Sequence, residues 1–125
     1  MTRLGTAICF GVGASALIFL LDLARLTGAH PGWAGHLFLS GTFLGSLLAF
    51  LVVHLQFVPR TIGLSLLVIG AYLTADYGRM LFTAPFAEDR IAGQMWFYGW
   101  HVLCITLVAH IISVSYERLE WAQRS

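Results

Sequence analysis

The fold is decided by the stretch Asp22-Leu23-Ala24-Arg25, which is followed at residues 34–41 by AGHLFLSG. A second version, Asp76-Tyr77-Gly78-Arg79, is followed at residues 92–99 by AGQMWFYG. In both versions an Asp and an Arg stand at the end of one apolar segment, and a loop follows. The next apolar segment then begins with two small residues, one variable residue, an apolar residue and an aromatic residue. We interpret this pattern as a tandem duplicated helical hairpin, with repeat 1 at about residues 3–57 and repeat 2 at about residues 60–116.

The composition around these two stretches is that of a membrane protein. The 125 residues are 58% hydrophobic and 10% charged, outside the range of soluble globular domains. A helix needs about 20 apolar residues to cross a hydrocarbon core of about 30 Å. Four blocks approach this length: residues 4–21, 37–57, 62–82 and 91–116. The sequence therefore predicts an all-α integral membrane protein, a single transmembrane domain over residues 1–125 that forms a four-helix up-down bundle.

The segments between and within these helices give further expectations. Glycines such as Gly41 and Gly45 form small-residue stripes that we assign to helix packing. Pro59 and Arg60 are expected to turn the chain back between the second and third helices. The aromatic cluster at residues 96–100 is expected to anchor the fourth helix at the membrane interface or to contact another subunit. The loop at residues 83–90 contains Pro85, Glu88 and Asp89 and is expected to lie in water.

The last nine residues, 117–125, are predicted to form a short amphipathic tail. Its charged side chains are expected to point outward: Glu117, Arg118, Glu120 and Arg124. Arginines are slightly more numerous on the side of the two termini than on the side of the Asp and Arg pairs, four against three. By the positive-inside rule we expect both termini in the cytoplasm of a bacterium, with the protein in the inner membrane.

The repeated charges allow two interpretations. Since a helix places residues three apart on one face, Asp22 can pair with Arg25, and Asp76 with Arg79. Each pair is then a salt bridge at a helix end, with the Arg reaching lipid phosphate. Alternatively, the four charges converge on a pseudo-twofold axis and form a vestibule for an ion, an anionic headgroup or a proton. The sequence leaves both open.

Histidines inside the apolar segments raise a third possibility. His54 and His110 lie at similar depths on helices that are diagonal in an up-down bundle, so they could hold a b-type haem. Against this, an offset of two residues between their places in the repeat turns one ring by about 200°. The alternative is that His54 reaches the interface and His110 bonds a neighbouring helix. His101, near mid-membrane, is expected to hydrogen-bond another helix.

The first hairpin resembles the GtrA family of small four-helix membrane proteins. The resemblance is carried by Phe10-Gly11-Val12-Gly13, Asp22, Ala34, Phe50 and the stretch at residues 54–60, HLQFVPR. It covers less than half of the chain, and the second hairpin departs further. The resemblance implies movement of a polyprenyl-linked sugar across the inner membrane.

The residues themselves indicate no catalytic or metal-binding motif, and none for nucleic-acid binding. We therefore expect a non-catalytic protein without a cofactor that binds membrane lipids and other membrane subunits or a second copy of itself. The first hypothesis is an accessory or structural subunit of a larger inner-membrane complex. The alternatives are a small transporter or flippase for an ion, a small solute or a lipid-linked substrate, and an electron-transfer subunit that binds b-type haem or quinone.

Overall fold

The computed structural model describes residues 2–84 and 89–125, and every regular element in these ranges is helical. The elements are α1 (Arg3–Leu20), α2 (Leu23–Leu26), the 3-10 turn η1 (Pro31–Trp33), α3 (Ala34–Val52), α4 (Phe57–Thr83) and α5 (Arg90–Arg124). Four stretches are long and apolar enough to cross a membrane: α1, η1 with α3, α4 and α5. The predicted number of membrane-length helices is confirmed. Pro85 and Glu88 of the expected aqueous loop lie outside the described residues.

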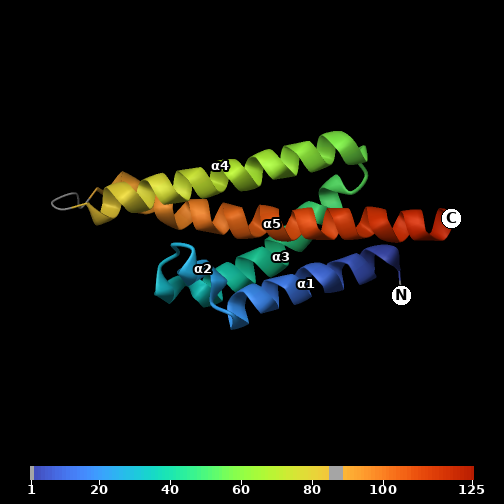
Figure 1. The fold of residues 1–125 in the computed structure, drawn as a ribbon, viewed down its shortest axis with the longest axis horizontal. Coiled ribbons are helices and arrows are strands. Elements are labelled where there is room, and N and C mark those ends of the chain that lie inside the picture. The colour runs from blue at the N-terminus through green and yellow to red at the C-terminus, as the bar shows by residue number, and fades with distance from the viewer. Residues whose placement is uncertain (1, 85–88) are drawn as a thin grey trace.

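The four long helices alternate in direction, so both chain termini lie at one end of the bundle (Figure 1). We call this the terminal end, and the other, where α1 and α4 finish, the loop end. At the terminal end Arg3 Nε donates to Gln123 Oε1 at 2.5 Å, which joins the start of α1 to the end of α5. The up-down order expected from the sequence is therefore present.

The bundle is organised around α5, which contacts α1, α3 and α4. Half of the most apolar stretch of α5 is buried, against 17% for α1 and for α4. Because α3 and α5 are in direct contact, the expectation that the second and fourth membrane helices are diagonal is wrong. Among the described residues, α4 packs extensively against α5 but hardly against α1 or α3, and α1 and α4 lie on different sides of α5 (Figure 1).

Glycines allow this central helix to be approached from several directions. A Cβ added to Gly45 of α3 would lie 2.8 Å from Val108 Cβ, and one added to Gly11 of α1 would lie 2.3 Å from Ile112 Cγ1. A Cβ on Gly99 of α5 would similarly lie 2.8 Å from Ala75. These contacts confirm helix packing at Gly11 and Gly45, since close backbone approach is how apolar helices gain contact in lipid. At Gly13, Gly63 and Gly70 an added Cβ would meet nothing within 4 Å, so these glycines do not pack on another helix in this way.

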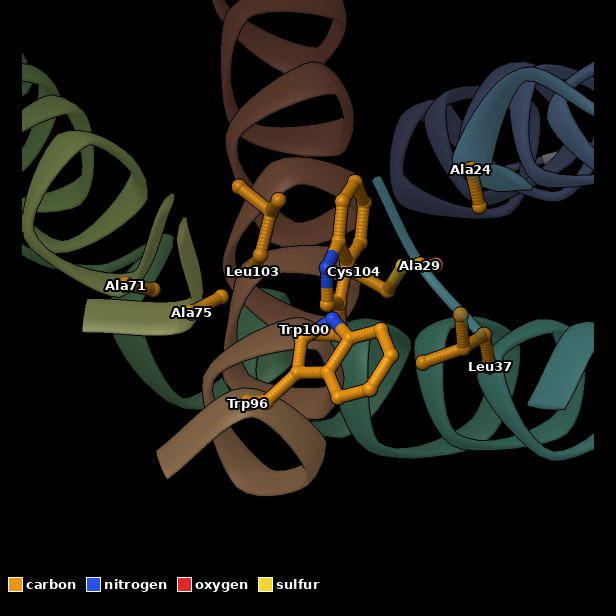
Figure 2. Close-up of a cluster of buried hydrophobic side chains, with 9 residues drawn as sticks. All are labelled: Ala24, Ala29, Leu37, Ala71, Ala75, Trp96, Trp100, Leu103 and Cys104. Carbon is orange, nitrogen blue, oxygen red and sulfur yellow. The ribbon is translucent and has the colours of Figure 1, made fainter. Parts of the chain in front are cut away.

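Two tryptophans of the predicted interfacial cluster lie in the core instead. Trp96 and Trp100 of α5 are 9% and 5% exposed. The cluster that surrounds them consists mainly of small side chains (Figure 2). They come from α2, from α4 and from the segment between α2 and α3, residues 27–33, which we call the first connection. Alanines leave space that an indole can fill, so the face of α5 that carries Trp96 and Trp100 is buried at this level. Tyr98, midway between them in the chain, is 60% exposed and remains available to the membrane or to a partner.

The helix ends differ from the predicted ones in three places. The first membrane helix stops at Leu20, and Asp22 adopts a left-handed conformation with φ of 53°, so Arg25 belongs to the separate α2. Pro59 lies in the first turn of α4 rather than in a connection, because the missing N–H of proline costs no intrahelical bond there. The predicted tail is the continuation of α5 to Arg124.

Candidate functional site

The two Asp and Arg pairs form the local salt bridges predicted from their spacing. Arg25 Nε lies 2.5 Å from Asp22 Oδ2, and Arg79 Nη2 lies 2.7 Å from Asp76 Oδ1. Both pairs lie towards the loop end of the bundle (Figure 1). Within residues 2–84 and 89–125, no ion pair joins the Asp22 and Arg25 pair to the Asp76 and Arg79 pair. Each carboxylate is therefore neutralised by the arginine of its own helical turn.

The two pairs have different surroundings. Asp22 is the N-cap residue of α2, whereas Asp76 lies within the continuous helix α4. The Arg25 side chain is 56% exposed and the Arg79 side chain 39%. Arg79 lies against the first connection, because a Cβ added to Gly28 would be 3.2 Å from Arg79 Nε. The second pair thus contacts the other hairpin through Arg79.

The first connection is fastened to α5 at the same place. Trp96 Nε1 donates to the carbonyl of Gly28 at 2.9 Å. The rings of His30 and Trp33 lie 5.9 and 4.9 Å from that of Trp96, centroid to centroid. Gly28 has a φ of 118°, a conformation that glycine adopts without steric cost. The connection thus covers this part of α5 between Arg79 and the indole.

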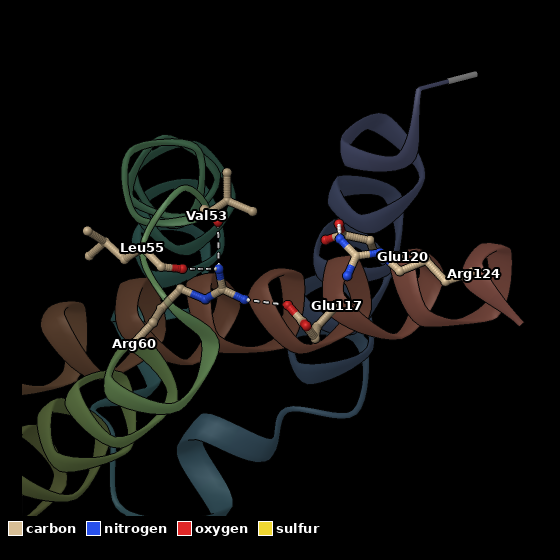
Figure 3. Close-up of polar contacts among 6 residues, drawn as sticks. All are labelled: Val53, Leu55, Arg60, Glu117, Glu120 and Arg124. Carbon is tan, nitrogen blue, oxygen red and sulfur yellow. Dashed lines mark hydrogen bonds and ion pairs between the residues drawn. The ribbon is translucent and has the colours of Figure 1, made fainter.

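A second polar centre, at the terminal end, was not predicted from the sequence. Arg60 of α4 is only 5% exposed. Its Nη1 donates to the carbonyls of Val53 and Leu55 at 2.6 and 3.0 Å, and its Nη2 donates to Glu117 Oε2 at 3.3 Å (Figure 3). The guanidinium carbon also lies 5.5 Å from the centre of the Phe57 ring. Arg60 thereby joins the end of α3, the start of α4 and the last third of α5.

This arrangement has a clear physical origin. A helix leaves its last carbonyls without intrahelical partners and carries partial negative charge there. Arg60 lies eight residues after the end of α3 and donates to the carbonyl of Val53, the C-cap residue of α3, and to that of Leu55 in the following turn. Glu117 then neutralises the buried cation. The expectation that Glu117 and Glu120 point outward is wrong, because the Glu117 side chain turns towards Arg60 and is 25% exposed, and the Glu120 side chain is 21% exposed. Glu120 pairs with Arg124 instead (Figure 3).

From Glu117 towards the loop end, polar residues continue along one face of α5. Thr106, His110, Ser113 and Glu117 are spaced by four, three and four residues, which places them on one side of a helix. Gly99, which packs on Ala75 of α4, continues the same spacing. The polar line therefore faces α4. Thr106 donates to the carbonyls of its own helix, whereas His110 Nδ1 and Ser113 Oγ are buried without a hydrogen-bond partner.

The histidines do not make the contacts with other helices, or with one another, that were considered from the sequence. His101 Nδ1 lies 2.8 Å from the carbonyl of Phe97, so its partner is in its own helix rather than in another. No hydrogen bond in the described part of the chain joins His110 to a neighbouring helix as expected, and its Nδ1 is buried without a partner there. His54 is exposed in the turn after α3, and no hydrogen bond or ring contact among the described residues joins it to His110. Near Gly45, the contact of α3 with α5 leaves no room for a macrocycle between them.

Hollows open on the outer surface on both sides of α4. One hollow, of about 500 Å³, lies between α4 and α5 and is lined by Leu66, Leu67, Gly70, Ala71, Thr74, Ile91, Gln94, Met95, Tyr98, Gly99 and Val102. A second, about 300 Å³, adjoins the Arg60 centre and is lined by Phe57, Val114, Glu117, Arg118 and Trp121. Both are walled by apolar side chains with a few polar groups, which suits a lipid chain or a partner helix.

The described residues contain no group of three or more His, Cys, Asp or Glu side chains that could hold a metal ion. The chemistry that the arrangement offers is hydrogen bonding and charge neutralisation at the two polar centres, together with apolar contact around α4. Comparison of the chain with protein-family models, with curated proteins and with solved structures gave no match in any of the three.

Proposed function

We propose that this chain is a multi-pass protein of a bacterial inner membrane that acts without catalysis, as an accessory subunit bound to lipids and to a larger membrane complex. The observation that carries the proposal is the hollow between α4 and α5, a concave surface of about 500 Å³ on the outside of the bundle. We also propose that the two hairpins descend from a duplication, because both carry the Asp and Arg pair and a similar entry into the next helix. The slight excess of arginine at the terminal end supports a cytoplasmic location for both termini.

The lining of this hollow suits a transmembrane helix of another subunit. Its floor includes the small residues Gly70, Ala71 and Gly99, and a Cβ added to Gly70 would meet nothing within 4 Å. Its rim includes Thr74 and Tyr98, whose hydroxyl groups can hydrogen-bond across helices. In lipid, helices associate through close packing at small residues and through such interhelical hydrogen bonds. The surface offers both.

Site-specific photo-crosslinking in intact cells tests this proposal. A photoreactive amino acid replaces Leu66, which lines the hollow and is 64% exposed, or Leu47, which is 54% exposed on α3 and serves as the matched control. We expect a crosslink to one other membrane polypeptide from position 66 and none from position 47. Gly70→Leu should fill the floor and remove the crosslink. The same product from both positions, or products with lipid alone, would contradict the proposal.

A transporter is the second candidate, and the polar line on α5 favours it. Membrane interiors hold few polar groups, and those present commonly mark the route of an ion or substrate. Ser113 and His110 lie in such a line, which ends at the Glu117 carboxylate. For this candidate, including the lipid-linked substrates suggested by the GtrA resemblance, position 66 should crosslink to a second copy of the chain. A Soret band in the purified protein would instead support the haem-binding alternative.

A further inference from the structure

A hollow of about 440 Å³ lies between α3 and α4 in the half of the bundle near the terminal end. We propose that it binds one acyl chain of a membrane phospholipid, with the lipid phosphate at the start of α4. This inference rests on the proposed function in one respect, that the chain lies in a membrane and binds lipids. It concerns a different surface from the hollow between α4 and α5, with which it shares only Leu67.

The inner part of this hollow is apolar. Leu48 and Val52 line it from α3, and Gly63, Leu64 and Leu67 line it from α4. The two helices hardly pack against each other among the described residues. A Cβ added to Gly63 would meet nothing within 4 Å, so the space beside this glycine is open. An open apolar groove on a membrane protein is a surface that a lipid chain can cover.

The depth of the hollow matches one leaflet of a bilayer. Its lining extends along α4 from Gln56, which is exposed at the terminal end, to Leu67. These residues are 11 positions apart, which corresponds to about 16 Å of helix. The hydrocarbon core of a bilayer is about 30 Å thick. The hollow therefore reaches from the membrane surface to about the middle, as an acyl chain does.

The polar end of the hollow has hydrogen-bond donors that lack acceptors. Arg60 lines the hollow, its side chain is 2% exposed, and its Nε has no hydrogen-bond partner among the described residues. The first backbone bond of α4 is donated by the Arg60 amide to the carbonyl of Gln56 at 3.2 Å. The amides of Phe57 and Val58 precede it, and no side chain caps the helix there.

A phosphate supplies what these donors lack. The first amides of a helix have no intrahelical acceptors and carry partial positive charge, which favours a bound phosphate. A buried donor without an acceptor, such as Arg60 Nε, is uncommon in native proteins, and an oxygen atom of a bound lipid satisfies it. Because Glu117 already offsets the charge of Arg60, the site should require a phosphate but not an anionic headgroup.

Filling the hollow tests the proposal. Gly63→Leu places a side chain in open space, so the protein should fold but lose the lipid. Gly70→Leu is the matched control, because Gly70 also faces open space but lines only the hollow between α4 and α5. In native mass spectrometry with added dioleoyl phosphatidylethanolamine, we expect several-fold less bound lipid for Gly63→Leu than for the unaltered protein or Gly70→Leu. Equal lipid binding by Gly63→Leu and the unaltered protein would overturn the proposal.

The crosslink from position 66 separates this inference from the proposed function. Gly63→Leu should keep that crosslink, whereas Gly70→Leu should remove it. If the unaltered protein gives no crosslink but Gly63→Leu still loses the lipid, the partner surface fails and the lipid site stands. If Gly63→Leu loses the crosslink and keeps the lipid, a protein occupies the hollow and the lipid site is refuted.

A second measurement needs no substitution. The unaltered protein is titrated with dioleoyl phosphatidylethanolamine and with dioleoylglycerol, which has the same acyl chains but no phosphate. We expect dioleoylglycerol to bind several-fold more weakly, because it cannot satisfy the amides at the start of α4 through a phosphate. Equal binding of the two lipids would overturn the placement of a phosphate at this helix end.

Discussion

The indole nitrogen of Trp96 donates a 2.9 Å hydrogen bond to the carbonyl of Gly28, and this bond holds the first connection against the start of α5. The two residues are 68 positions apart in the chain. Gly28 also lies against Arg79, so helices from both hairpins meet at one backbone turn. The loop end of the bundle is therefore built by contacts between the hairpins, not by either hairpin alone.

Substitution of Gly28 should weaken this junction. Gly28→Ala places a Cβ at a φ of 118°, where residues other than glycine are strained, and about 3.2 Å from Arg79 Nε. We expect a loss of about 1–3 kcal/mol in stability, seen as a lower Tm in detergent. Gly35→Ala is the control, since an added Cβ there meets nothing within 4 Å. Equal effects of the two substitutions would argue against the junction.

Loss of the Arg60 partner should be among the most damaging single changes. Glu117→Leu leaves a guanidinium that is 98% buried at the side chain without its counter-charge, and breaking such a pair costs about 3–5 kcal/mol. Arg60→Met combined with Glu117→Leu should recover much of the loss, because no buried charge then remains. Thermal unfolding of the two variants measures this.

The control for the ion pair is Arg118→Met, which removes an exposed arginine one position further along α5. Its effect on Tm should be small, as for most surface substitutions. If Glu117→Leu were as mild as Arg118→Met, the Arg60 and Glu117 side chains would not be coupled in the folded protein.

Glycines of the bundle should divide into two classes on substitution by alanine. At Gly45 the new Cβ would lie 2.8 Å from Val108 Cβ and 2.9 Å from the backbone carbonyl oxygen of Ile105, so we expect a loss of about 1–3 kcal/mol from overpacking. At Gly70 it meets nothing within 4 Å, and the better helix propensity of alanine should give a gain of up to about 1 kcal/mol. Denaturation in detergent checks both signs. A destabilising Gly70→Ala would mean that a neighbour already occupies that surface in the purified protein.

The two Asp residues should respond differently to neutralisation. Asp22→Asn should change stability by less than about 0.5 kcal/mol, because its salt bridge is exposed and asparagine accepts a positive φ. Asp76→Asn should cost more, up to about 1 kcal/mol, since it releases Arg79 beside Gly28. Unfolding of each variant measures this difference.

Asp76→Asn, together with Arg79→Gln, also tests the two interpretations of the repeated charges. If Asp76→Asn and Arg79→Gln each leave the photo-crosslink at position 66 and the assembly of the purified protein unaltered, the charges act as helix-end anchors. Loss of either property at near-normal stability would instead indicate a binding role for the second pair, and Asp22→Asn provides the comparison.

Several features follow from the sequence because short-range spacing and composition carry them. Runs of about 20 apolar residues require helices in lipid, so the four membrane-length stretches were predictable. The salt bridges of Asp22 with Arg25 and of Asp76 with Arg79 follow from a three-residue spacing on a helix. Close packing at Gly45 follows from a small-residue stripe.

Other features were decided only by the tertiary structure. Where every face of a helix is apolar, hydropathy does not distinguish the face that meets lipid from the face that meets another helix. The sequence therefore did not reveal that α5 is central, nor that Trp96 and Trp100 lie inside. The burial of Arg60 depends on α5 continuing as a helix far enough to bring Glu117 to its level. In the same way, the repeated Asp and Arg pairs look alike in sequence, but the break between α1 and α2 at Asp22 and the packing of Gly28 against Arg79 make their surroundings different.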